Sequence, residues 1–417
     1  MYCQIQGISH DGQGVGRIDG KVVFVPDALP GETVELSIIE EKRNYLRGRL
    51  NSIVEPSPAR IDPPCPFFGR CGGCHYQHAS YEMQVTLKTR VVEQTLQRIG
   101  SIDTDVSPCI PALKPWRYRN KVAWHGTMAD GEWTFGYYRG ESNDIINIDN
   151  CLLVSEAMQT AGLEISGVLK ELKPGAPAEA TVRQSNYNEA LMAIVAGIDK
   201  EAALKILSRA DGLLDSFYWL STRGIECLKE GGRFEERIGE IRFGLSPLSF
   251  FQVNSEQAAK LVGLVGEALD LQGGEQLLDA YCGVGTLALS QAGRAKRVVG
   301  VESYPAAVED ARKNARLNGL NNCRFLAGDT AQVLPTLSQK FDAVILDPPR
   351  SGCHPQVIKA VERMKIPRVV YVSCDPSTLA RDIARFQQAG YRIKTVRPLD
   401  MFPQTYHVEV IILLQRL

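Results

Sequence analysis

Gln276-Leu277-Leu278-Asp279-Ala280-Tyr281-Cys282-Gly283-Val284-Gly285-Thr286-Leu287 is the stretch that decides the fold of this 417-residue chain. It begins as a short apolar strand, passes through a turn with two glycines and ends at a helix start. Glycines in such a turn let a cofactor approach the backbone closely. A full dinucleotide fingerprint is absent, because Leu287 and Ala288 follow the two-glycine turn. The stretch predicts a Rossmann-like domain.

Acidic residues follow the next three predicted strands. Arg297–Val301 is followed by Glu302, about 20 residues after the turn, which suits a ribose diol. Asp329 follows the third strand, where it could accept a hydrogen bond from an adenine amino group. Phe341–Leu346 leads into Asp347-Pro348-Pro349-Arg350. This ordered set resembles class I S-adenosylmethionine-dependent methyltransferases. The arginine departs from the D/N-P-P-aromatic motif of exocyclic amino methylases and indicates a different target atom.

Val369-Val370-Tyr371-Val372-Ser373-Cys374-Asp375-Pro376 reads as a buried strand that ends on a cysteine. Asp375 and Pro376 suit the N-cap and first turn of a helix. A thiol at this junction faces the positive end of the helix dipole, so we expect a lowered pKa and a nucleophilic thiolate. The alternative is a small buried core residue, which is the usual fate of a free cysteine.

Glu409 opens a final apolar strand, and the alternative to a functional role is a solvated carboxylate at a loop edge. A thiol and a carboxylate in a methyltransferase together suggest methylation at C5 of a pyrimidine. Because C5 is a poor nucleophile, a thiolate first adds to C6, and a base removes the C5 proton after methyl transfer. Cys374 is the candidate nucleophile and Glu409 the candidate base.

A cysteine cluster, Cys65-x5-Cys71-x2-Cys74, is rich in glycines that let the backbone wrap around a metal centre. Cys151 is a good candidate for the fourth ligand, and Cys109 is its competitor. Sets of four cysteines hold either zinc or an iron–sulfur cluster, and the spacing leaves both open. Unrelated structural thiols are the remaining alternative.

The rest of the chain divides into parts of different composition. Residues 1–54 have short β-prone runs with glycine turns, which predict a small barrel. A proline-rich linker, residues 55–66, precedes the cysteine cluster, and a helix is expected over about 80–99. Residues 109–240 look α+β. From about residue 250, helices and strands alternate, which is typical of a doubly wound α/β domain.

The composition of the chain indicates the kind of compartment and the kinds of partner to expect. The chain has 11 cysteines and no secretory signal or membrane-length apolar run, which suggests a reducing compartment and no membrane contact. The net charge of −1 gives no support to nucleic-acid binding by the chain as a whole. However, residues 360–417 carry nine Lys or Arg against five Asp or Glu, and residues 84–121 carry seven against three. Such basic segments are compatible with RNA binding, although solvated faces are the simpler reading.

The chain resembles the RNA 5-methyluridine (uracil-C5) methyltransferases, and among them the bacterial 23S ribosomal RNA members with a TRAM domain and an iron–sulfur cluster. The resemblance covers almost the whole chain and rests on five motifs: DAYCGVGT (279–286), DPPRSG (347–352), SCDP (373–376), MFPQTYHVE (401–409) and CPFFGRCGGCHYQH (65–78). It implies a multidomain enzyme with an OB-like TRAM barrel (1–54), an α+β iron–sulfur domain (55–76 and 109–249) and a Rossmann-like methyltransferase domain (77–108 and 250–417).

The resemblance also implies site residues and partners. The expected [4Fe-4S] ligands are Cys65, Cys71, Cys74 and Cys151, the nucleophile is Cys374 and the base is Glu409. The expected contacts to S-adenosylmethionine are Gln252, Tyr281, Thr286, Glu302, Asp329 and Asp347. A cytoplasmic monomer that flips a uridine of 23S rRNA out of its stack is expected.

Other functions remain as alternatives. Within the same chemistry, transfer RNA is the second candidate substrate, although members that act on the T-loop often lack the TRAM module or the cluster. A cytosine-C5 methyltransferase would have a different cysteine context and no HVE carboxylate. An iron–sulfur redox protein would use the cluster itself, and an inactive RNA chaperone would not need Cys374 and Glu409.

Overall fold

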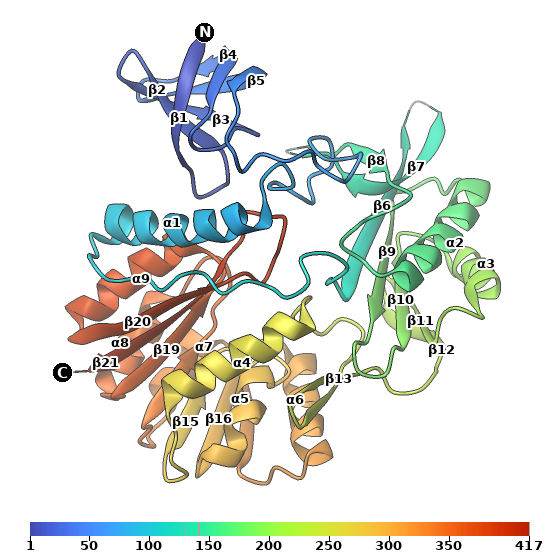
Figure 1. The fold of residues 1–417 in the computed structure, drawn as a ribbon. Helices are drawn as coiled ribbons and strands as arrows, with labels where there is room; N and C mark the ends of the chain where they lie inside the picture. Colours follow the sequence, from blue (N-terminus) through green and yellow to red (C-terminus); the bar gives the residue numbers. More distant parts are fainter. Residues whose placement is uncertain (130, 141, 417) are drawn as a thin grey trace.

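The computed structural model describes residues 1–129, 131–140 and 142–416. Its N-terminal part is a closed five-stranded barrel in the order β1-β2-β3-β5-β4, as predicted (Figure 1). Alternate side chains fill the barrel, with Ile5, Val23 and Leu36 almost completely buried. The strands are β1 (Tyr2–Ile8), β2 (Gly14–Ile18), β3 (Lys21–Val25), β4 (Thr33–Glu41) and β5 (Tyr45–Glu55).

The central part is a seven-stranded sheet in the order β12-β11-β10-β9-β6-β7-β8. Helices α2 (Glu156–Leu172) and α3 (Lys200–Ala210) cover one face of this sheet (Figure 1). The strands are β6 (Lys121–Ala129), β7 (Glu132–Tyr138), β8 (Ile145–Asn147), β9 (Ala178–Gln184), β10 (Leu191–Ala196), β11 (Ser216–Ser221) and β12 (Gly224–Lys229), and a hairpin of β13 (Glu235–Ile238) and β14 (Ile241–Gly244) follows. This confirms an α+β arrangement.

The C-terminal part is a seven-stranded sheet in the order β17-β16-β15-β18-β19-β21-β20, in which β21 is antiparallel to its neighbours. Its strands are β15 (Gln276–Asp279), β16 (Arg297–Glu302), β17 (Cys323–Ala327), β18 (Ala343–Leu346), β19 (Arg368–Ser373), β20 (Tyr391–Leu399) and β21 (Glu409–Arg416). The helices are α4 (Ser255–Leu269), α5 (Thr286–Gln291), α6 (Pro305–Leu317), α7 (Thr330–Val333), α8 (Pro355–Arg363) and α9 (Pro376–Gln388), with short 3-10 helices η1 (Ala292–Arg294) and η2 (Leu334–Thr336). Separate apolar clusters form on the two faces of the sheet, which confirms the doubly wound prediction.

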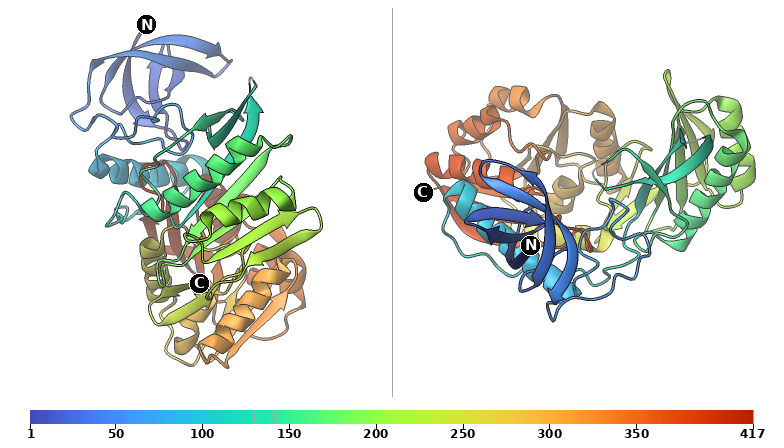
Figure 2. Two further views of the ribbon diagram at one scale, coloured as in Figure 1. Left: turned by 90° about the vertical axis from the view of Figure 1, so that its right-hand side faces the viewer. Right: turned by 90° about the horizontal axis from the view of Figure 1, so that it is seen from above.

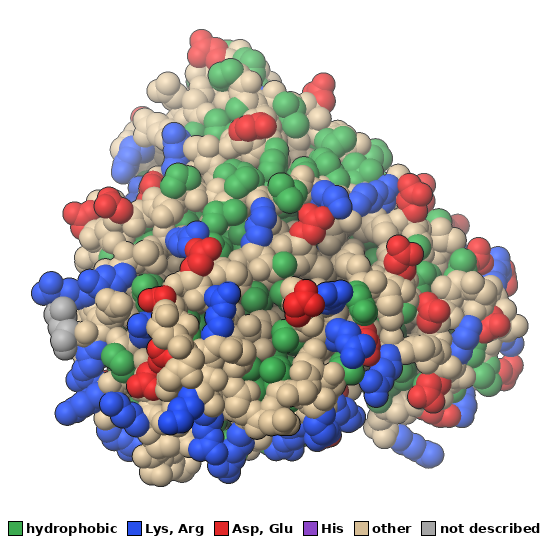
Figure 3. All heavy atoms as spheres, turned by 60° about the horizontal axis from the view of Figure 1, so that its bottom comes forward, with side chains coloured by type: hydrophobic (Ala, Val, Ile, Leu, Met, Phe, Trp, Pro, Cys, Tyr) green, Lys and Arg blue, Asp and Glu red, His purple; other side chains and the backbone are tan. Residues whose placement is uncertain are grey.

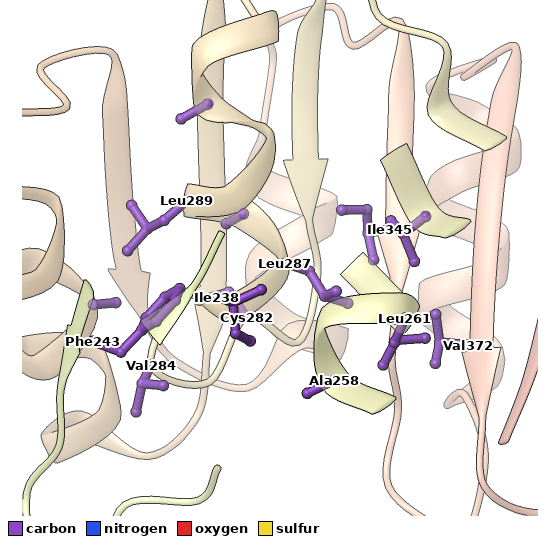
Figure 4. Packing of buried hydrophobic residues seen from close by; sticks show 14 of the residues in the cluster. Ile238, Phe243, Ala258, Leu261, Cys282, Val284, Leu287, Leu289, Ile345 and Val372 are labelled. Carbon is purple, nitrogen blue, oxygen red and sulfur yellow. The ribbon is translucent and has the colours of Figure 1, made fainter. Parts of the chain in front are cut away.

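The glycine turn is fixed by the core beneath it. Val284, Leu287 and Leu289 lie in the same buried cluster as Leu261 of α4 and Ile345 of β18 (Figure 4). Gly285 has φ +89°, and a Cβ there would stand 2.9 Å from Leu289 Cδ1. A side chain at Gly285 would therefore strain the turn and disturb the start of α5.

Helix α1 (Tyr81–Gly100) packs against α9 and β20, although it precedes the central sheet in the chain (Figure 1). Ser80 caps it by accepting a hydrogen bond from the Met83 N–H at 3.3 Å. The packing agrees with a helix that belongs with the C-terminal part, whereas the exact domain boundaries stay predictions. Two further views show the barrel, the central sheet and the C-terminal part as three lobes (Figure 2). In the described part of the chain, none of the helices has the length and apolarity needed to cross a membrane.

Candidate active site

The C-terminal sheet brings Cys374, Glu409 and Asp347 to one edge. Cys374 follows β19, and Glu409 begins β21, which pairs with β19 through Ser373 and Val410. Asp347 follows β18, which runs parallel to β19 on its other side. The charges of both Glu409 and Asp347 act on the Cys374 thiol, so the three side chains form one electrostatic group. The two predicted catalytic residues therefore meet with a third carboxylate.

The expectation of a lowered pKa for Cys374 is wrong. Burial and the neighbouring carboxylates of Glu409 and Asp347 raise the pKa of Cys374 to about 11, against the opposing effect of Arg350. Asp375 caps α9 as predicted, accepting a hydrogen bond from the Thr378 N–H at 2.8 Å. The helix start is thus present, but burial and negative charge outweigh its dipole. The thiol is mostly protonated at neutral pH.

The carboxyl groups at this edge have pKa values above their ordinary range. Glu409 is 3% exposed, and burial together with the charge of Asp347 raises its pKa well above the ordinary value. Burial also raises the pKa of Asp347. Asp279 at the end of β15 is buried as well, and burial and the charge of Asp347 raise its pKa to about 7. Because these carboxyls crowd one site, they cannot all ionise at neutral pH. Once ionised, Glu409 is a strong proton acceptor.

A cavity of about 50 Å³ lies over the glycine turn and is lined by Gln252, Tyr281, Thr286 and Asp347. Glu302 accepts a hydrogen bond from the Gly283 N–H at 3.1 Å, which ties the end of β16 to the turn. Four of the six predicted cofactor contacts thus share one cavity, and Glu302 adjoins the turn.

For two acidic residues, the structure differs from the predicted set of cofactor contacts. Asp329 accepts a hydrogen bond from the Ala331 N–H at 2.7 Å and caps α7, and it is not among the residues that line the cavity. Asp279 lines the cavity but was not predicted as a contact. Its two carboxylate oxygens are buried and make no hydrogen bond of normal geometry among the described residues, although the backbone N–H groups of Tyr281 and Ala288 lie close enough to lower its pKa. A buried carboxylate with no side-chain partner suits a ligand with a cationic or donor group. The sequence signal that could have identified Asp279 as a contact is its place at the end of the strand, just before the glycine turn.

The cysteine cluster forms a second site. Cys65, Cys71, Cys74 and Cys151 line one cavity of about 750 Å³. Burial raises the pKa of Cys74 to about 12, and the charges of Cys151 and Cys71 contribute. In the residues that the structure describes, no group of three His, Cys, Asp or Glu side chains is arranged for a single metal ion. The four cysteines predicted as ligands therefore share one cavity, but their thiols are not arranged around a single metal ion.

Of two further residues near this second site, Cys109 lies outside the cavity and Arg119 lines it. Cys109 is not part of the cavity lining; it is buried near α1, and its backbone N–H donates to Thr89 Oγ1 at 2.9 Å. Arg119 lines the cavity, and its guanidinium interacts with the charges of Cys74 and Cys151. A half-buried arginine beside several thiols favours their thiolate forms. Arg119 had no signal in the sequence beyond a basic segment.

A loop connects the two sites. His75 and Tyr76, directly after the cysteine cluster, donate their backbone N–H groups to the Gln404 carbonyl at 2.8 and 3.0 Å. At the start of the same loop, the Lys88 ammonium of α1 pairs with Asp400 at 2.5 Å, and both side chains are fully buried. The loop from Asp400 leads directly into Glu409. The cysteine loop and α1 together therefore fix the segment that carries the candidate base.

Comparisons with known proteins agree with this geometry. Residues 235–417 match the family model described as tRNA (uracil-5-)-methyltransferase, and residues 4–50 match the TRAM domain. An uncharacterized RNA methyltransferase of Halalkalibacterium halodurans is 36% identical over 438 residues, covering 99% of this chain and 96% of the relative. Another, of Caldanaerobacter subterraneus, is 38% identical over 441 residues, with 99% and 97% covered.

A solved structure also matches the whole chain. It is the tRNA (uracil-54, C5)-methyltransferase of Pyrococcus abyssi in complex with S-adenosyl-L-homocysteine. The TM-score is 0.77 at 28% sequence identity, and the match covers 99% of this chain and 100% of the other. The N-terminal barrel therefore corresponds to a TRAM domain, and the C-terminal part to a methyltransferase fold.

Proposed function

Because the chain belongs to the S-adenosylmethionine-dependent RNA (uracil-5-)-methyltransferases, we propose that it methylates C5 of a specific uridine in 23S rRNA through a covalent adduct. The observation that carries the proposal is the meeting of Cys374 and Glu409 at the carboxyl edge of the C-terminal sheet, beside the cavity lined by Gln252 and Thr286. One thiol and one carboxylate are the two groups that methylation of a pyrimidine at C5 requires.

The proposed reaction assigns one step to each residue. The Cys374 thiol first loses its proton to solvent, and the resulting thiolate adds to C6 of the uracil, which gives C5 the character of a carbanion. Arg350 favours this thiolate, because its charge opposes the rise in the Cys374 pKa. After C5 has gained the methyl group, Glu409 accepts the C5 proton, and the Cys374 thiolate leaves as the C5–C6 double bond re-forms. The raised pKa of Glu409 suits this step, since it makes the ionised carboxylate a stronger base.

The target base has to leave its stack for this chemistry. Cys374 needs access to C6, and the methyl donor needs access to C5, and a stacked base in a helix exposes neither ring face. We therefore propose that the uridine is flipped out of a loop or unpaired site, where unstacking costs least.

S-Adenosylmethionine supplies the methyl group in an electrophilic form. The proposed contacts are Gln252, Tyr281, Thr286, Glu302, Asp329 and Asp347, and Asp279 joins them because its buried carboxylate lines the same cavity. Asp329 is the least supported member because it caps α7.

The four cysteines are proposed to hold a [4Fe-4S] cluster. In support, Cys65, Cys71, Cys74 and Cys151 line one cavity, and several of them influence one another electrostatically. A polynuclear cluster holds its thiolates farther apart than a single ion does, so it suits four thiols that share a cavity without surrounding one point. Because this cavity adjoins the loop that leads to Glu409, the cluster would serve to position the loop and the RNA.

The choice between ribosomal and transfer RNA is the finer part of the proposal. The TRAM barrel and the four cysteines favour 23S rRNA through the resemblance stated above. Transfer RNA is the second candidate, because the Pyrococcus abyssi enzyme, which matches along its whole length, is named for uracil-54 of tRNA. We propose that the enzyme acts as a monomer in the cytoplasm.

Mapping of 5-methyluridine in a strain that lacks the gene tests this choice. We expect one or more 23S rRNA sites to lose the methyl group and to regain it with the wild-type gene but not with Cys374→Ala. Loss at a tRNA position alone would transfer the proposal to tRNA. Loss at neither would refute it.

A further inference from the structure

The amino-terminal edge of the C-terminal sheet carries a concentration of basic residues opposite the active site. Lys296 and Arg297 stand at the start of β16, Arg324 at the start of β17 and Lys340 just before β18. Because these strands are parallel, their starts lie at the same edge. The full set, called the basic edge below, comprises Arg294, Lys296, Arg297, Arg324, Lys340, Arg363, Lys365, Arg368, Arg392 and Arg416.

The antiparallel strand β21 extends the basic edge to the other end of the sheet. Arg368 at the start of β19 pairs in register with Gln415, next to Arg416 at the end of β21. Tyr391 at the start of β20 pairs with Arg416, which places Arg392 at the same edge. The topology thus gathers basic residues from six segments that are far apart in sequence.

The residues of the basic edge lack carboxylate partners in the described part of the chain, although Arg363, Arg368 and Arg416 each donate to a backbone carbonyl. None of the ten forms an ion pair with a carboxylate among the described residues, whereas many other exposed bases do, such as Lys200 with Glu226. Four acids, Asp270, Glu275, Asp342 and Glu362, share the edge. The Asp342 and Glu275 carboxylates accept backbone N–H groups of Gln276 and Gln272. Basic side chains gather along the lower part of this face of the molecule (Figure 3). In a chain of net charge −1, this is a local segregation of positive charge.

The basic edge lies too far from Cys374 to contact the target loop itself. The six residues of β19 alone separate the two edges by about 20 Å. An RNA that delivers its uridine to the opposite edge reaches the basic edge only with another segment of a folded molecule. Resting on the proposed function, we infer that the basic edge is a second RNA-binding surface. It holds backbone phosphates of an RNA segment remote from the methylated uridine.

The inference predicts that RNA length decides whether the basic edge matters. A triple variant, Lys296→Glu, Lys340→Glu and Lys365→Glu, is compared on two RNAs by filter binding and methyl transfer. One RNA is a long folded transcript around the mapped uridine, and the other is a short hairpin with the same loop. We expect the Kd for the long RNA to rise roughly tenfold or more at low salt, because three phosphate contacts become repulsive. The slope of log Kd against log salt should flatten by about 3.

Two control variants test whether the loss of long-RNA binding is specific to the basic edge. Lys170→Glu in α2, Lys173→Glu at the C-cap of α2 and Lys205→Glu in α3 change the net charge equally and should leave the binding of both RNAs unaffected. The milder Lys→Gln triple at the basic edge should weaken long-RNA binding in the same direction, and unchanged turnover of the hairpin shows that both edge variants fold. Equal loss on both RNAs, no loss on either, or the same loss from the α2–α3 variant would overturn the inference. Failure of the proposed function would look different, since the wild-type enzyme would then methylate neither RNA.

Discussion

The Cys374 thiol should be slow to react in the RNA-free enzyme, although it is the proposed nucleophile. Its pKa of about 11 arises from burial and from the Glu409 and Asp347 carboxylates. At about pH 8 only about one thiol in a thousand is then ionised, against about one in four for an ordinary cysteine with a pKa near 8.5. Alkylation by iodoacetamide, which requires the thiolate, should therefore be roughly 200-fold slower than for an ordinary thiol at the same accessibility.

The assay is alkylation of each cysteine, followed by peptide mass spectrometry across a range of pH. The rate at Cys374 should rise about tenfold per pH unit to about pH 10 without a plateau, since the ionised fraction grows in proportion to hydroxide. The slope is independent of the partial burial of the side chain, which lowers all rates equally. The exposed Cys227 serves as an internal control for the reagent.

A second variant tests the cause of the raised pKa. Glu409→Gln removes the strongest charge that raises the pKa of Cys374, so the alkylation profile should shift toward lower pH. A wild-type plateau below about pH 8 would refute the reasoning, because it would mean that the helix start controls the thiol. An unchanged profile in Glu409→Gln would refute the assigned electrostatic contact.

Three further predictions follow from the same contacts. Glu409→Gln should permit addition and methylation but stall proton removal, so that a denaturation-resistant enzyme–RNA adduct accumulates on gels; its absence would remove Glu409 from the role of base. Lys88→Met should lower the free energy of unfolding by about 3–5 kcal/mol in urea titrations, because it leaves the fully buried Asp400 carboxylate without its ion-pair partner; Lys88→Met with Asp400→Asn should recover part of this loss, and a cost below about 1 kcal/mol would contradict a buried pair. Cys71→Ser should lower the iron and acid-labile sulfide of the purified protein, whereas Cys109→Ser should not, and equal content in both would contradict the proposed ligand set.

Much of the fold was predictable because its signals are local. The glycine turn at Gly283 and Gly285, the apolar run before Cys374 and the N-cap at Asp375 each specify structure from adjacent residues. The small barrel was predicted from the short β-prone runs and glycine turns of residues 1–54, and the structure has it as five strands. Such signals place Cys374 and Glu409 at strand ends, and the pairing of β19 with β21 then brings them together.

Properties that depend on residues distant in sequence could not be predicted. The raised pKa of Cys374 requires Asp347 from another strand and Glu409 from the end of the chain. The buried pair of Lys88 and Asp400 joins residues 312 positions apart. The raised pKa and the buried ion pair both depend on the packing of the C-terminal sheet and helix α1, so no local sequence pattern predicts them.

The central claim is that Cys374 bonds to C6 of the target uracil. The most direct test incubates the enzyme and S-adenosylmethionine with RNA in which 5-fluorouridine replaces the target uridine. Because fluorine at C5 cannot be removed as a proton, we expect a stable adduct, with mass spectrometry locating the modified nucleotide on the Cys374 peptide. Cys374→Ala should form none, and the unsubstituted RNA should give methylated product instead. An adduct on another residue, or methylation that persists in Cys374→Ala, would contradict the account.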